Sequence, residues 1–202
     1  MKRSVAALAM LSMVVVAVVF GPQLVIASKH LSEADMALFE AVKSNRGSMI
    51  KKALDAGADI NAVNEGGQTP LMHASLLGSA WAVRSLLKAG ADAAIGEKDG
   101  YTPMHGAGFQ GRAEVAQVLH EFGIEINDKH RDGFTPIQRA CWGGEKRHAD
   151  TVETMVKLGA NVADLKICFE SPNPISKDLA IKHLGDDVYQ EHLKESNPTP
   201  EL

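Results

Sequence analysis

Apolar residues recur along this chain at the spacing of an amphipathic helix. Val83, Leu86 and Leu87 occupy positions i, i+3 and i+4, with polar residues between them. Such a stripe predicts a helix that buries one face and exposes the other. The same stripe returns at Val115, Val118 and Leu119 and again at Val152, Met155 and Val156. A glycine follows each stripe and is a common helix stop, so the pattern predicts several similar helices.

A turn motif of glycine, any residue, threonine, proline and an apolar residue occurs three times. Its copies are 67–71, 100–104 and 133–137, so successive threonines lie 33 residues apart. Glycine takes a positive φ without penalty, threonine can cap a helix with its hydroxyl, and proline suits the first helical position. Each copy therefore predicts a tight turn followed by the start of a helix.

Three copies at one fixed period indicate a stacked repeat architecture. The period and the Thr-Pro-apolar core resemble those of the ankyrin repeat family, and the resemblance covers about 32–193. It implies an all-α solenoid of stacked helix-turn-helix units joined by β-turn fingers, with about four repeats and a degenerate C-terminal cap. We expect repeats at about 34–64, 66–97, 99–130 and 132–166, the cap at 175–193 and a flexible tail at 194–202.

Several positions depart from the family pattern. Only the third repeat has the histidine that follows Thr-Pro-apolar, His105, which the resemblance implies is structural and bonds within and between turns. Gly106 and Gly108 lie in the following helix, where we expect them to make the repeat locally soft. The fourth repeat has three extra residues within 145–150, which we expect to form a charged surface loop, and 168–174 also indicates a loop.

The first residues have the layout of a secretory signal peptide. Lys2 and Arg3 precede an uncharged run at 4–26, and the small or tolerated residues at 25–27 favour cleavage after Ala27. An uncleaved anchor is the alternative, since about 23 apolar residues are enough to cross a bilayer. Both interpretations place the repeats outside the cytosol. A buried N-terminal helix is the weakest alternative, because the run is apolar on all sides.

Composition is ordinary for a soluble globular protein, with 45% hydrophobic and 23% charged residues. The net charge of −4 disfavours nucleic acid or an anionic membrane surface as the main partner. The two cysteines, Cys141 and Cys168, are too few for a disulfide scaffold. An oxidising compartment would allow them to pair, but their positions in the repeats argue against it.

The sequence contains no strong catalytic motif. The segment 138–143 around Cys141 loosely resembles a cysteine-protease nucleophile segment, but the repeat register places Cys141 in a packed helix. Histidine, cysteine and carboxylate spacings give no metal site, and no glycine-rich loop follows a strand pattern. We therefore expect no enzyme activity and no cofactor; a cysteine-dependent enzyme using Cys141 is the least favoured alternative.

Aromatic residues stand out at two repeat positions. By resemblance, ankyrin domains bind proteins through turn tips and the inner face of each first helix. The candidate contact residues are Glu65, Gln68, Leu76, Leu77, Lys98, Tyr101, Phe109, Gln110, Arg131, Phe134 and Trp142, with Lys129 also at the polar rim. The resemblance implies a monomeric, non-catalytic module that grips one protein partner in a concave groove. Two alternatives remain: rings that pack on one another between repeats, and an accessory or protective subunit of an enzyme.

Overall fold

The computed structural model describes residues 31–196, which belong to one compact unit. The predicted signal peptide or anchor at 1–27 lies outside the described residues, as does 197–202 of the predicted tail. Residues 194–196 are the end of a helix rather than part of a flexible tail. None of the described helices is long and apolar enough to cross a membrane.

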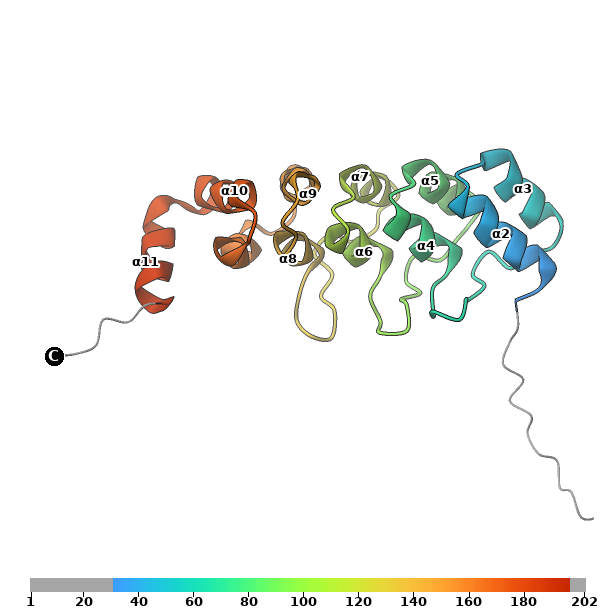
Figure 1. Cartoon of the computed structure of the whole chain (residues 1–202), viewed down its shortest axis with the longest axis horizontal. Coiled ribbons are helices and arrows are strands. Elements are labelled where there is room, and N and C mark those ends of the chain that lie inside the picture. The colour runs from blue at the N-terminus through green and yellow to red at the C-terminus, as the bar shows by residue number, and fades with distance from the viewer. Residues whose placement is uncertain (1–30, 197–202) are drawn as a thin grey trace, which may run out of the picture. The chain divides into compact units, whose positions relative to one another are not determined.

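The described helices pack in two rows (Figure 1). One row consists of α2 (Glu33–Lys43), α4 (Pro70–Leu77), α6 (Pro103–Phe109), α8 (Pro136–Cys141) and the 3-10 helix η1 (Val162–Glu170). The other consists of α3 (Gly47–Asp55), α5 (Ala80–Lys88), α7 (Ala113–Glu121), α9 (Lys146–Lys157) and α10 (Pro174–Leu184), and α11 (Asp186–Ser196) follows. Each helix contacts its hairpin partner and its neighbours in the row, which confirms the predicted all-α solenoid of stacked helix pairs.

The repeated turn motif forms as the sequence predicts. Its glycines adopt left-handed backbone conformations, with φ of 76° at Gly67, 90° at Gly100 and 86° at Gly133. The hydroxyl of Thr69 accepts a hydrogen bond of 3.2 Å from the backbone N–H of Met72, which is a helix cap. A proline begins each of the three helices that follow these turns.

The other two threonines link neighbouring repeats. Thr102 Oγ1 lies 2.8 Å from Nδ1 of His105, whose Nε2 lies 3.3 Å from the carbonyl oxygen of Phe134 in the next turn. His105 therefore bonds within its own turn and to the following one, as expected. Thr135 Oγ1 donates to the carboxylate of Asp164 at 3.1 Å and so connects α8 to η1.

The apolar stripes of the second row are buried between repeats. Val83, Leu86, Val115 and Leu119 have no exposed surface, and they belong to one continuous core that runs through the stack. A single helix pair has no second layer on which to bury such a stripe, so neighbouring repeats supply it. The stability of the unit thus depends on the interfaces between repeats.

Gly106 and Gly108 have a packing role. A Cβ on Gly108 would collide with the carbonyl oxygen of Pro136, so α6 approaches α8 more closely than a side chain permits. A Cβ on Gly106 would lie 3.0 Å from the terminal methyl of Met72. The two glycines, which weaken an isolated helix, allow the close contact of α6 with its neighbours.

The extra residues of the fourth repeat are helical, so the predicted surface loop at 145–150 is wrong. They lengthen α9 to 12 residues, compared with 9 in α5 and in α7. His148 and Ala149 are buried, and Nε2 of His148 lies 3.2 Å from the carbonyl oxygen of Phe109 at the end of α6. Burial of these two side chains stabilises the added turn.

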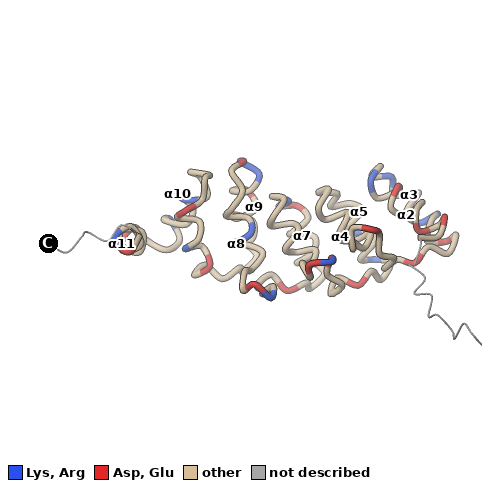
Figure 2. Tube along the Cα trace, turned by 60° about the horizontal axis from the view of Figure 1, so that its bottom comes forward, with Lys and Arg blue, Asp and Glu red and all other residues tan. Residues whose placement is uncertain are grey.

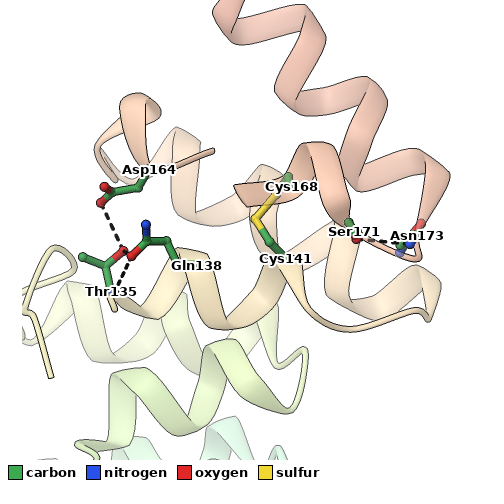
Figure 3. The surroundings of a disulfide bond; sticks show 7 residues. All are labelled: Thr135, Gln138, Cys141, Asp164, Cys168, Ser171 and Asn173. Carbon is green, nitrogen blue, oxygen red and sulfur yellow. Dashed lines mark hydrogen bonds between the residues drawn. A yellow bond between two sulfur atoms is a disulfide. The ribbon is translucent and has the colours of Figure 1, made fainter. Parts of the chain in front are cut away.

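The cysteines form a disulfide, which corrects the sequence-based argument against pairing. Cys141 at the end of α8 and Cys168 in η1 have Cα atoms 4.8 Å apart (Figure 3). The predicted loop at 168–174 is wrong in its first half, because η1 continues through Glu170 and brings Cys168 against α8. Closing a loop of 27 residues stabilises a fold by about 3 kcal/mol.

The last pair in the two rows is η1 with α10, so only the second helix of this pair overlaps the predicted cap at 175–193. Helix α10 lies beside α9 and packs against η1. Helix α11 buries none of its residues and contacts the unit through Tyr189 and His192, whose rings pack against Phe169. The irregular spacing of η1 conceals it from a search for α-helical stripes.

Leu86→Ala and Leu119→Ala should each lower the free energy of unfolding by about 2–5 kcal/mol, because both side chains are fully buried in the core. The exposed Lys88→Ala, on the last turn of α5, serves as the control and should change it by less than about 0.5 kcal/mol. Urea unfolding followed by circular dichroism measures all three. A leucine variant as stable as the control would contradict the packing of the second row.

Candidate protein-binding surface

Three of the predicted aromatic residues meet around one arginine. The guanidinium carbon of Arg139 lies 4.8 Å from the ring centre of Tyr101, 5.0 Å from that of Phe134 and 4.4 Å from that of Trp142. The rings of Phe134 and Trp142 also meet edge to face, with centres 4.8 Å apart. We call Tyr101, Phe134, Arg139 and Trp142 the aromatic–arginine cluster.

Sequence reasoning missed Arg139. The residue lies on α8 three positions before Trp142, and this spacing places two side chains on the same face of a helix. A search for charged residues at i−3 from a candidate aromatic would have found it.

Asp132 neutralises the buried arginine. Nη2 of Arg139 donates hydrogen bonds to Oδ2 of Asp132 and, at 3.0 Å, to the hydroxyl of Tyr101, which itself donates to Asp132 at 3.0 Å. Burial alone would raise the pKa of Asp132, but hydrogen bonds from His130, the Phe134 N–H and Arg139 hold it well below its ordinary value. Asp132 therefore supplies the negative charge that pairs with the Arg139 guanidinium among the rings.

His130 also packs against the ring of Tyr101. The two rings stack with centres 3.9 Å apart, and Nε2 of His130 lies 2.9 Å from the carbonyl oxygen of Asp99. Burial and the hydrogen bond to Asp132 raise the pKa of the Tyr101 phenol. Two neighbouring turns thus hold Tyr101 in one orientation.

A pocket of about 290 Å³, which we call the central pocket, adjoins the cluster. It is lined by Met72, Leu76, Glu97, Tyr101, His105, Gly106, Phe109 and Arg139. Most of these residues come from the first row of helices and the turn before α6. Phe109 lines this pocket and is 55% exposed, whereas Trp142 is 38% exposed. Of the four aromatic candidates, Tyr101, Phe134 and Trp142 therefore meet around Arg139, and Phe109 lines the pocket together with Tyr101.

The remaining predicted contact residues are more dispersed. Leu77 lines a separate hollow of about 380 Å³ over α2 and α4, together with Phe39 and His73. Gln68 is half-buried, and its side-chain oxygen lies 3.2 Å from Nδ1 of His73, which lines the same hollow as Leu77. The exposed members are Glu65, Lys98, Lys129 and Arg131 on the turns, whereas Leu76 and Gln110 are half-buried.

Charges of both signs lie along the turns (Figure 2). Lys98 and Asp99 are exposed on one turn, and Arg131 and Asp132 follow each other on the next. A mixed polar rim beside apolar rings is the usual anatomy of a protein-binding surface. Among the described residues, no group of three or more histidine, cysteine or acidic side chains is placed to hold a metal ion.

Comparison with known proteins agrees with the repeat pattern. A family model described as ankyrin repeats (3 copies) matches residues 14–96 and 86–165, which is more than half of the chain. The comparison with curated proteins found no match.

Asp132→Asn should make the free energy of unfolding less sensitive to acidic pH. The pKa of Asp132 is lower in the folded chain than its ordinary 3.8. The ionised carboxylate therefore stabilises the fold fully above about pH 3.8, and this stabilisation is lost as the pH falls from there towards the lowered pKa. The unfolding free energy, measured by urea titration between about pH 6 and pH 2, should fall less steeply in the variant. Asp99→Asn, in the preceding turn, is the control. Equal slopes for Asp132→Asn and the unmodified chain would exclude this ion pair as a source of acid sensitivity.

Proposed function

Because the chain belongs to the ankyrin repeat family, we propose that it is a non-catalytic module that binds one protein partner through the concave face of its repeats, outside the cytosol. Ankyrin repeats indicate a protein–protein interaction module. The binding face is the one formed by the turns and the first-row helices. Its centre is the third and fourth repeats, where the aromatic–arginine cluster adjoins the central pocket.

The exposed rings of Phe109 and Trp142 carry this proposal. An aromatic side chain that a fold leaves half-exposed beside an apolar pocket is available to a partner, and buried aromatic anchors supply much of the energy of protein interfaces. Arg139 and Phe134 already hold Trp142 in place. A ring that is ordered before binding loses little conformational entropy on binding.

Some rings of the aromatic–arginine cluster pack on other side chains of the fold, as the alternative interpretation expects. Tyr101 stacks on His130 and bonds to Asp132, and Phe134 packs against Trp142, so these two residues contribute to the fold as well as to the surface. The structure therefore favours Phe109 and Trp142 over Tyr101 as contacts that a partner can bury. An accessory or protective subunit of an enzyme would use the same face, with the enzyme as the partner.

Cys141 offers little to a cysteine-dependent enzyme. Its sulfur is bonded to that of Cys168, and the residue has no exposed surface. A nucleophilic cysteine needs a free and accessible thiolate. The interaction module is accordingly preferred to catalysis at this position.

The disulfide supports a location outside the cytosol. Disulfides persist in oxidising compartments and are rare in the reducing cytosol. Lys2, Arg3 and the apolar run after them support the same location, since they have the layout of an export signal. The two arguments are independent, because one concerns the leader and the other the end of the repeat stack.

Protein isolated from its native host should begin at Ser28 and should react with a thiol reagent only after reduction. The first result reports removal of the leader, and the second reports the Cys141–Cys168 bond. N-terminal sequencing and mass spectrometry after alkylation measure them. Intact Met1 in the membrane fraction would favour the anchor, and free thiols with intact Met1 in the soluble cytosolic fraction would exclude export.

Phe109→Ala and Trp142→Ala should each weaken binding of the partner by about 2 kcal/mol, or roughly thirtyfold. Phe122→Ala is the matched control, because Phe122 is 37% exposed but follows α7 in the other row. The partner is first captured from the extracytoplasmic fraction and identified, and its affinity is then measured by calorimetry beside the melting temperature of each variant. Wild-type affinity in both variants would exclude this face as the binding site.

A further inference from the structure

The central pocket contains a carboxylate that the fold does not use. Two charged side chains line this pocket, Glu97 and Arg139. Asp132 already pairs with Arg139. Within the described part of the chain, the carboxylate of Glu97 makes no hydrogen bond or ion pair. The charge that the pocket offers to a ligand is therefore negative.

Glu97 differs from the residues at the equivalent position of the neighbouring turns, because their side chains form hydrogen bonds. Asn64, Glu97 and His130 lie 33 residues apart, and each donates its backbone N–H to the carbonyl oxygen four residues later. The side chain of Asn64 accepts a hydrogen bond of 3.0 Å from the N–H of Gln68, and that of His130 lies 2.9 Å from the carbonyl oxygen of Asp99. The side chain of Asn64 thus stabilises its own turn and that of His130 binds the preceding turn, whereas Glu97 leaves its carboxylate available.

Most of the rest of the lining is apolar. Met72 and Leu76 of α4 and Phe109 of α6 form the apolar walls of the pocket beside Gly106. A volume of about 290 Å³ is at the lower limit for small-molecule sites and suits one long side chain of a bound protein. Lysine and arginine combine an apolar stem with a cationic end, which matches apolar walls with one carboxylate.

Resting on the proposed function, we infer that the central pocket takes a lysine or arginine side chain of the partner protein. The stem packs on Met72, Leu76 and Phe109, and the charged end pairs with Glu97. Lys98, the nearest basic residue in the sequence, does not line the pocket; its backbone and Cβ lie against the preceding turn at Gly67. The net charge of −4 adds a long-range attraction for a cationic partner.

Two model compounds test the chemistry of the pocket without the partner. Nα-acetyl-lysine methylamide carries the cationic end, and Nα-acetyl-norleucine methylamide has a similar stem without it. Each is titrated into the full chain, and binding is followed through the NMR methyl signals of Met72 and Leu76. The lysine compound should bind about fivefold more tightly than the norleucine compound, the ratio expected for one partly exposed ion pair.

Glu97→Gln should abolish this preference and leave the norleucine compound unaffected. Asp99→Asn removes a negative charge from the same turn but not from the pocket lining, so it is the matched control and should keep the preference. Equal affinities for the two compounds in the unmodified chain, or no shift of either methyl signal, would overturn the inference. A preference that survives Glu97→Gln would do the same.

Binding of the captured partner to the variants distinguishes a failure of the cationic contact from a failure of the proposed function. Glu97→Gln should weaken its binding about fivefold, beside the larger effects of Phe109→Ala and Trp142→Ala. If the two alanine variants weaken binding and Glu97→Gln does not, the face is correct but the cationic contact is wrong. If none of the three weakens binding, the proposed function fails as well.

Discussion

Packing between neighbouring repeats is the interaction on which this structure depends. A single helix pair has no second layer against which to bury its apolar stripe. Leu86 and Leu119 are therefore fully buried only when the neighbouring pair packs against them. The same constraint explains Gly108, which brings α6 and α8 closer than a side chain would allow. Because the stack holds equivalent positions side by side, residues 33 apart in sequence become neighbours on one surface.

The aromatic–arginine cluster is a consequence of that arrangement and of the cost of burying a charge. A buried guanidinium is unfavourable unless it is paired and hydrogen-bonded. Arg139 meets this requirement through Asp132, the Tyr101 hydroxyl and three ring faces, although its Nε finds no hydrogen-bond partner among the described residues. The partners come from two turns and one helix, so the cluster also holds the third and fourth repeats in register. Stability and the proposed binding surface therefore share the same contacts.

The C-terminal end of the stack is held together differently. Helix η1 has poorer hydrogen-bond geometry than an α-helix, as 3-10 helices generally do. Additional links compensate for this: the Cys141–Cys168 disulfide and the hydrogen bond from Thr135 to Asp164 attach η1 to α8 (Figure 3). Helix α10 then covers η1 in the second row. The disulfide therefore joins the last pair of the two rows covalently to the repeat before it.

The sequence by itself determined the repeat, its period, the turns and the buried stripes, because these depend on local geometry and on spacing along the chain. It also placed Tyr101, Phe134 and Trp142 among the candidate contact residues, since a fixed period brings equivalent positions of neighbouring repeats together. Only the tertiary structure decided the rest. Arg139 became central through contacts with residues up to 38 positions away. The extra turn of α9, the course of η1 and the pairing of the cysteines were settled by burial against other repeats, which no local pattern encodes.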